Sequence, residues 1–177
     1  MLEQEIKIPA SLAAGYVIKI GTDILGTLWP RIEDDFTGYN KFVITDENLV
    51  SAGHLQKLLG QRDVPKFIIS PAGETSKNID TAISIIEAME KVYLGRDTLV
   101  IALGGGTVGD IAGFAAAIFK RGVPVLQIPT TTVAQADSSA KTDSHSDDSI
   151  GTAVQDLVPA NIGTGILLGG RSLTTRD

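Results

Sequence analysis

Three glycines between an apolar run and a small-residue segment have the spacing of a phosphate-binding turn. Gly104, Gly106 and Gly109 match the pattern G-x-G-x-x-G. Glycine lets a backbone approach a pyrophosphate closely, and the free amides at the start of the following helix favour an anion. The pattern alone is weak. The acidic residue of the common dinucleotide site, about 20 positions later, is missing, because Thr130 and Thr131 stand there instead.

Polar residues follow the other predicted strands as well. Carboxylates accept hydrogen bonds from ribose hydroxyls, hydroxyl and amide groups bond to base or sugar, and a lysine neutralises phosphate. Since ligands bind at the carboxyl ends of parallel strands, this convergence indicates a nucleotide site. The candidate cofactor-binding residues are Asp46, Asn48, Glu74, Lys77, Gly105, Gly106, Asp110, Thr130 and Thr131. Gly105→Val is expected to block the pyrophosphate with little change in fold.

Each of these residues also has an ordinary structural interpretation. The glycines form a tight turn in that alternative. Asp46 and Thr130 are then helix caps. Glu74 and Lys77 are then a surface ion pair three positions apart on a helix.

The elements that must position these residues alternate along the chain. Short apolar runs are separated by segments of helical period, which predicts a parallel sheet with helices on both faces, a Rossmann-like α/β fold. Two alternating runs at 4–8 and 15–20 predict a small antiparallel pair at the N-terminus. The predicted core strands are 41–45, 66–70, 98–103 and 124–128, and the predicted helices occupy 46–60, 71–95 and about 107–120.

Composition excludes several classes of protein. The 177 residues are 43% hydrophobic with a net charge of −6, which predicts a globular protein and argues against nucleic acid as a partner. The sequence has no cysteine, so it has neither disulfides nor thiolate metal sites. No apolar run reaches the roughly 18 residues of a membrane helix, and the acidic start is unlike a signal peptide. A cytoplasmic protein that does not bind membranes is the expectation.

Three motifs resemble those of the 3-dehydroquinate synthase family, in the sugar-phosphate cyclase superfamily. They are PAGETSKN, LGGGTVGDIAGFAAAIFKRG and QIPTTTVAQADSS. The resemblance implies a lyase of the shikimate pathway, which serves aromatic amino acid biosynthesis. It implies that NAD oxidises and then re-reduces 3-deoxy-D-arabino-heptulosonate 7-phosphate, a phosphorylated sugar acid, while phosphate is eliminated and 3-dehydroquinate forms. It also implies the NAD contacts named above.

The resemblance carries catalytic roles onto Arg121, Asp137 and Lys141. The family's arginine reaches a neighbouring subunit's site, so a homodimer is implied. From the residue alone, Arg121 suits a carboxylate or phosphate, or is simply a cation at a helix C-terminus; Asp137 is equally a helix cap. In the family, zinc or cobalt is held by one Glu and two His in a helical C-terminal domain. That domain is absent from this sequence, so no metal ligand is assigned.

The resemblance stops at Thr142, after a gap of two glycines that must be accepted to align Lys141. The expected division is therefore an NAD-binding α/β domain over 1–142 and a divergent tail over 143–177. A cloned piece, a frameshifted end and a natural short form all fit this pattern. The expectation is an N-terminal portion that is inactive alone. The alternatives are a non-enzymatic NAD-binding module, or a related cyclase such as 2-deoxy-scyllo-inosose synthase.

Overall fold

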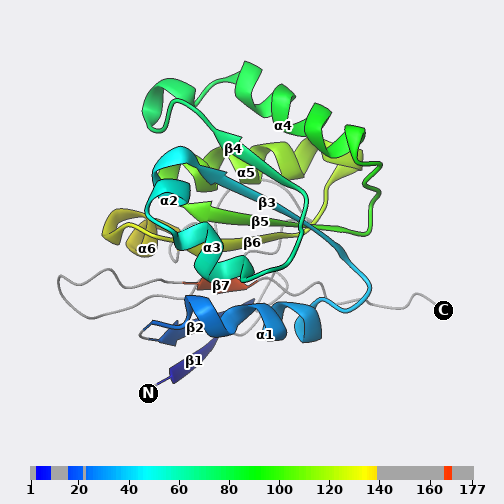
Figure 1. Cartoon of the computed structure of the whole chain (residues 1–177). Helices are drawn as coiled ribbons and strands as arrows, with labels where there is room; N and C mark the ends of the chain where they lie inside the picture. Colours follow the sequence, from blue (N-terminus) through cyan, green and yellow to red (C-terminus); the bar gives the residue numbers. More distant parts are fainter. Residues whose placement is uncertain (1–2, 9–15, 22, 139–165, 169–177) are drawn as a thin grey trace.

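A seven-stranded sheet forms the centre of the computed structural model (Figure 1). The strands lie in the order β1-β2-β7-β6-β5-β3-β4. Four of them are parallel: β3 (Asn40–Asp46), β4 (Lys66–Ile69), β5 (Thr98–Gly104) and β6 (Val125–Pro129). The structure describes residues 3–8, 16–21, 23–138 and 166–168.

The order of the parallel strands reverses between β3 and β5. The chain passes from β3 to β4 on one side, then crosses back so that β5 pairs with the other side of β3. A sheet with such a reversal binds ligands outside the carboxyl ends of its strands at that point. The predicted α/β fold with a parallel sheet is confirmed.

The other three strands are antiparallel to their neighbours. β1 (Glu3–Ile8) pairs with β2 (Tyr16–Gly21), as the alternating runs predict. β7 (Ile166–Leu168) lies between β2 and β6 and is antiparallel to both. No strand is predicted here from the sequence, because a segment of three residues is too short to show a period.

Helices cover both faces of the sheet. The helices α1 (Leu28–Asp35), α2 (Glu47–Ser51) and α3 (His54–Leu59) lie on one face, and α4 (Ile79–Lys91) and α5 (Gly106–Ile118) lie on the other (Figure 1). The remaining elements are α6 (Thr132–Ser138) and the 3-10 turns η1 (Leu25–Thr27), η2 (Glu74–Ser76) and η3 (Phe119–Arg121). No described helix is long and apolar enough to cross a bilayer.

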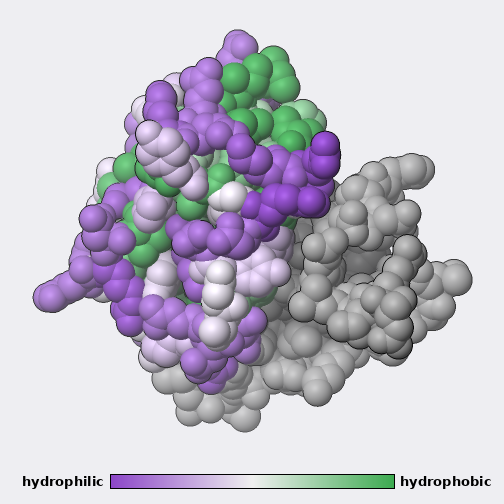
Figure 2. Space-filling model, turned by 90° about the vertical axis from the view of Figure 1, so that its right-hand side faces the viewer, coloured by the Kyte–Doolittle hydropathy of each residue, from purple (hydrophilic) through white to green (hydrophobic). Residues whose placement is uncertain are grey.

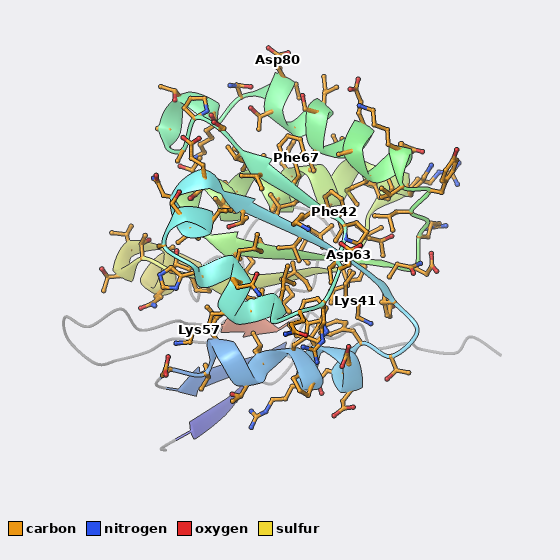
Figure 3. The ribbon with its side chains drawn as sticks, in the orientation of Figure 1. Lys41, Phe42, Lys57, Asp63, Phe67 and Asp80 are labelled. Carbon is orange, nitrogen blue, oxygen red and sulfur yellow. The ribbon has the colours of Figure 1, made fainter. Side chains whose placement is uncertain are left out.

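Successive side chains of a strand point to opposite faces of the sheet, so the sheet has two hydrophobic cores. The first core lies on the face covered by α1 and α3, and the second lies on the face covered by α4 and α5. On β5, Leu99, Ile101 and Leu103 face the first core, while Val100 and Ala102 face the second, so every residue of this strand is buried. Phe42 of β3 and Phe67 of β4 lie in the layer between the sheet and α4 (Figure 3). A strand covered on both faces reads as a continuous apolar run, which is why the sequence shows it clearly.

Two predicted details are wrong. The single helix predicted over 46–60 is split into α2 and α3, because Gly53 adopts a left-handed conformation with φ of +78°. The sequence also predicts that Pro30 limits the helix in its segment, but α1 continues to Asp35. Proline is tolerated in the first helical turn, where backbone amides have no intrahelical partner.

Candidate functional site

The carboxyl ends of the four parallel strands lie at one edge of the sheet, on the left in Figure 1, where α2 and α6 follow β3 and β6. All nine predicted cofactor-binding residues lie at this edge or in the first turns that follow it. Hydrogen bonds and ion pairs connect the four strand ends and the segments that follow them. The edge is therefore a continuous polar surface.

The glycines at the end of β5 serve close packing rather than an unusual turn. A Cβ at Gly104 would lie 2.3 Å from the Cβ of Val108, and one at Gly109 would lie 2.7 Å from Gln127 Oε1. Neither glycine has a positive φ. The tight-turn alternative is thus not what these glycines provide, because an L-residue could adopt their backbone angles. A side chain at Gly104 would collide with Val108, whereas at Gly109 the flexible end of Gln127 would have to move.

Gly105 and Gly106 differ in what surrounds them. A Cβ at Gly106, the first residue of α5, would meet no heavy atom within 4 Å, whereas one at Gly105 would lie 3.2 Å from Thr131 Cγ2. Gly105 precedes α5 without a side-chain cap. The first amides of a helix lack intrahelical partners. The start of α5 therefore offers backbone donors beside open space.

Contacts between side chains connect the loop after β4 to the first turns of α5. Thr107 Oγ1 donates to Glu74 Oε2 at 3.0 Å, and Lys77 Nζ lies 2.8 Å from Asp110 Oδ2 and 3.5 Å from Glu74 Oε1. The hydrogen bond from Lys77 to Asp110, and then the charges of Asp110 and Glu74, raise the pKa of Lys77. The ion pair between Glu74 and Lys77 exists, but the shorter contact of Lys77 is with the helix.

Three of the predicted residues also act as helix caps or connect neighbouring strands. Asp46 Oδ1 accepts from the Leu49 amide at 3.0 Å, so the capping interpretation of Asp46 holds in this structure. The cap of α6 is Thr131, whose Oγ1 accepts from the Ala134 amide at 3.2 Å. The Thr130 amide donates to the Gly104 carbonyl at 3.0 Å and ties β6 to β5. Asn48 is exposed on α2.

Of the predicted catalytic residues that the structure describes, Arg121 lies away from this edge. Arg121 is exposed in η3, at the opposite end of α5 from Gly106. Asp137 lies in the last turn of α6. Lys141 lies outside the described residues. Within one chain, the structure therefore separates Arg121 from the candidate cofactor residues.

A groove of about 310 Å³ opens between α4 and α5 beside this network. The ion pair of Lys77 and Asp110 forms its polar end, and the rest of its wall is mostly apolar. The lining residues are Lys77, Asn78, Ile79, Ala82, Asp110, Ile111 and Phe114. Among residues 23–135, no three His, Asp or Glu side chains come together as a metal site.

Two residues that connect elements of the site, Thr107 and Glu47, are not among those predicted from the sequence. Thr107 holds Glu74, and Glu47 holds the loop after β4 through Ser70 and the Ala72 amide. The place of Thr107 directly after the glycines could have indicated its role. Glu47 stands between two predicted residues in the sequence, but nothing in its spacing shows that it reaches Ala72.

The fold is similar to that of sugar-phosphate cyclases. A structure of 2-deoxy-scyllo-inosose synthase, complexed with carbaglucose-6-phosphate, NAD+ and Co2+, matches 76% of this chain and 38% of its own, with 25% identity and a TM-score of 0.61. A structure of 2-epi-5-epi-valiolone synthase from Streptomyces hygroscopicus, with NAD+ and Zn2+ bound, matches 73% of this chain and 36% of its own, with 26% identity and a TM-score of 0.57.

Beyond these structures, the chain is similar to the 3-dehydroquinate synthase family. Residues 67–153 match the family model of the 3-dehydroquinate synthase N-terminal region. The chain is 42% identical over 127 residues to the 3-dehydroquinate synthase of Alkaliphilus oremlandii, a match that covers 70% of this chain and 34% of that protein. The chain thus spans about a third of the length of this curated relative. The resemblance stated from the three motifs is confirmed.

Proposed function

We propose that this domain binds NAD at the carboxyl edge of β3–β6. The observation that carries the proposal is the start of α5, where Gly106 leaves open space beside backbone donors. A pyrophosphate suits that position, because a helix N-terminus favours an anion and no side chain obstructs it. The relatives 2-deoxy-scyllo-inosose synthase and 2-epi-5-epi-valiolone synthase carry NAD+ in their structures, which supports the same ligand here.

Different residues around this position are proposed to contact different parts of the cofactor. Lys77 supplies the positive charge for phosphate, and its pairing with Asp110 keeps it protonated and beside α5. Asp46 and Asn48 follow β3 and supply acceptors and a donor for ribose hydroxyls. Thr130 and Thr131 supply hydroxyls beside the glycine turn. When bound, NAD supplies a hydride acceptor and donor.

We propose that the whole enzyme containing this domain is a 3-dehydroquinate synthase. Its reaction would convert 3-deoxy-D-arabino-heptulosonate 7-phosphate to 3-dehydroquinate with loss of phosphate. The identity of 42% to a 3-dehydroquinate synthase, against 25% to 2-deoxy-scyllo-inosose synthase, supports this substrate over glucose 6-phosphate. The tests are turnover of each substrate by a form that includes the rest of the relatives' length.

The described residues do not fit a catalytic metal. Residues 23–135 bring no three His, Asp or Glu side chains together, although relatives contain Co2+ or Zn2+. We therefore assign no metal step to this domain and expect the 177-residue chain to bind NAD without cyclase turnover. Turnover of the heptulosonate phosphate by this chain with added zinc would contradict that expectation. The domain boundary at residue 142 stays a prediction.

A homodimer follows from the same proposal. Arg121 is placed at the far end of α5 from Gly106, so it cannot reach a substrate at the NAD edge of its own chain. In the proposed enzyme, Arg121 therefore contacts the substrate of a second copy. Sedimentation equilibrium of the purified chain measures whether two copies associate.

The direct test of the proposed function is NAD titration by isothermal calorimetry. Gly106→Val is expected to weaken NAD binding by about tenfold or more, which corresponds to about 1.4 kcal/mol. The control is Gly113→Ala, in the same helix, where a Cβ meets nothing closer than 4.0 Å. Absence of NAD binding by the unaltered chain, or an unchanged affinity in Gly106→Val, would overturn the proposal. Gly105→Val is a less clean probe, because its side chain also presses on Thr131.

A further inference from the structure

Glu47 connects two strand ends although it is not one of the predicted site residues. It is the first residue of α2, directly after β3. Its Oε1 accepts from the Ala72 amide at 3.0 Å, and its Oε2 accepts from the Ser70 hydroxyl. Both partners belong to the loop that follows β4. The contact therefore spans more than 20 residues of sequence and joins neighbouring strands at the candidate site.

The loop held by Glu47 leads directly to the residues that face α5. β4 ends at Ile69, and η2 begins at Glu74. Within the loop, the buried Ser76 donates its hydroxyl to the Pro71 carbonyl at 2.5 Å. Segment 70–77 is thus fixed at its start by Glu47, in its middle by Ser76 and at its end by the contacts of Glu74 and Lys77 with α5.

We propose that Glu47 is a positioning residue that holds Glu74 and Lys77 against the first turns of α5. The inference rests on the proposed NAD site, since the held residues are two of its candidate ligands. Glu47 itself is expected to make no contact with the cofactor. Its contribution is to fix the loop before NAD arrives, so that less ordering remains to be done on binding.

The chemistry of the Glu47 contacts suits this role. Hydrogen bonds to an ionised carboxylate are stronger than those between neutral groups. The Ser70 hydroxyl and then the Ala72 amide lower the pKa of Glu47, so the carboxylate is ionised at neutral pH. Gly73, between the Glu47 contacts and η2, has a positive φ of 104° and no nearby atom around its Cβ position. Without Glu47, the Ser70 hydroxyl and the Ala72 amide lose these partners, next to a glycine that no neighbouring side chain restrains.

The test compares Glu47→Ala, Glu47→Gln and Ser70→Ala in the full chain. The matched control is Glu87→Gln, which removes one negative charge from the exposed surface of α4. NAD affinity is measured by calorimetry, and amide hydrogen exchange is measured over residues 72–77. We expect Glu47→Ala to weaken NAD binding about fivefold to tenfold, the lower end of a typical coupling between two sites. Glu47→Gln and Ser70→Ala are expected to have smaller effects, and Glu87→Gln none.

A double-mutant cycle separates positioning from general stability. If Glu47 acts through Lys77, the double variant Glu47→Gln/Lys77→Met binds NAD as weakly as Lys77→Met alone. Urea unfolding identifies any variant that fails to fold, and Ser70→Ala keeps the test available if Glu47→Ala does. Unchanged NAD affinity in the folded Glu47 variants, or additive effects in the cycle, overturns the inference alone. Absence of NAD binding by the unaltered chain overturns the proposed function and the inference with it.

Discussion

The two ends of α5 use the backbone and side chains in different ways. At its start, Gly104, Gly105 and Gly106 have ordinary backbone angles, and the side chains that follow contact η2. At its end, Lys120 and Arg121 have positive φ values of 50° and 72°, although neither is glycine. Lys120 pairs with Glu90 of α4, and Arg121 is exposed. The start of α5 thus has glycines where neighbouring atoms approach closely. The segment after its end has two non-glycine residues with left-handed backbone angles.

The distance between the two ends of α5 limits which residues of one chain can contact the same ligand. α5 has 13 residues. At about 1.5 Å per residue, its two ends are about 20 Å apart. Figure 2 looks at the molecule from the right-hand side of Figure 1, away from the carboxyl edge, and much of that face is hydrophilic. A residue near the end of α5 is therefore not expected to contact a ligand bound at the start of α5.

The largest expected effect is on stability, at the start of α5. Gly104→Val places side-chain atoms where Val108 already lies, since even a Cβ would be 2.3 Å from the Val108 Cβ. Overpacking of this kind is expected to cost about 3 kcal/mol. The measurement is the urea midpoint against that of Gly106→Val, which has open space and is expected to change stability much less. Equal midpoints for these two variants would show that β5 and α5 can separate freely.

These packing requirements were partly visible in the sequence. The apolar runs of β3, β5 and β6 predict buried parallel strands, because both faces of each strand are covered. The same pattern predicts that the residues after the strands converge. Individual roles were less visible, since Gly104 and Gly106 look alike in sequence but only Gly104 has a neighbour in the way.

Other features depend on contacts between distant parts of the chain. Gly53 divides a segment of helical period into two helices, because it adopts a left-handed backbone angle between α2 and α3. The connection of Glu47 to Ser70 requires β3 and β4 to be neighbours in register. The distance of Arg121 from the strand ends depends on the length of α5, which the sequence alone gives only within a few residues.

A smaller effect is expected on ligand affinity when Lys77 is replaced. Lys77→Met leaves Glu74 and Asp110 without the cation between them, so both carboxylates repel an incoming pyrophosphate. NAD is expected to bind about tenfold more weakly, or about 1.4 kcal/mol. Calorimetric titration checks this, with Lys91→Met in the last turn of α4 as the control of equal charge. An equal loss in both variants would mean that net charge alone is responsible.

A still smaller effect is expected on the pH dependence of stability. Hydrogen bonds from Ser70 and Ala72 lower the folded-state pKa of Glu47, so its contribution is present above the unfolded pKa. The contribution is lost as the pH falls through the lowered, folded value. Urea midpoints of the unaltered chain and Glu47→Gln should therefore differ at neutral pH and converge in acid. A difference that persists after Glu47 is protonated would assign the effect to packing instead.

The smallest expected effect concerns Arg121, at the other end of α5. Arg121→Ala is expected to leave the NAD dissociation constant of this chain unchanged, because about 20 Å of helix separates it from Gly106. The comparison is made by calorimetry under the same conditions as Lys77→Met. A tenfold loss in Arg121→Ala would mean that a second copy brings its arginine to the cofactor itself. An unchanged affinity leaves the substrate of a neighbouring copy as the proposed ligand of Arg121, and separates the residues proposed to bind cofactor from the one proposed to act across a dimer.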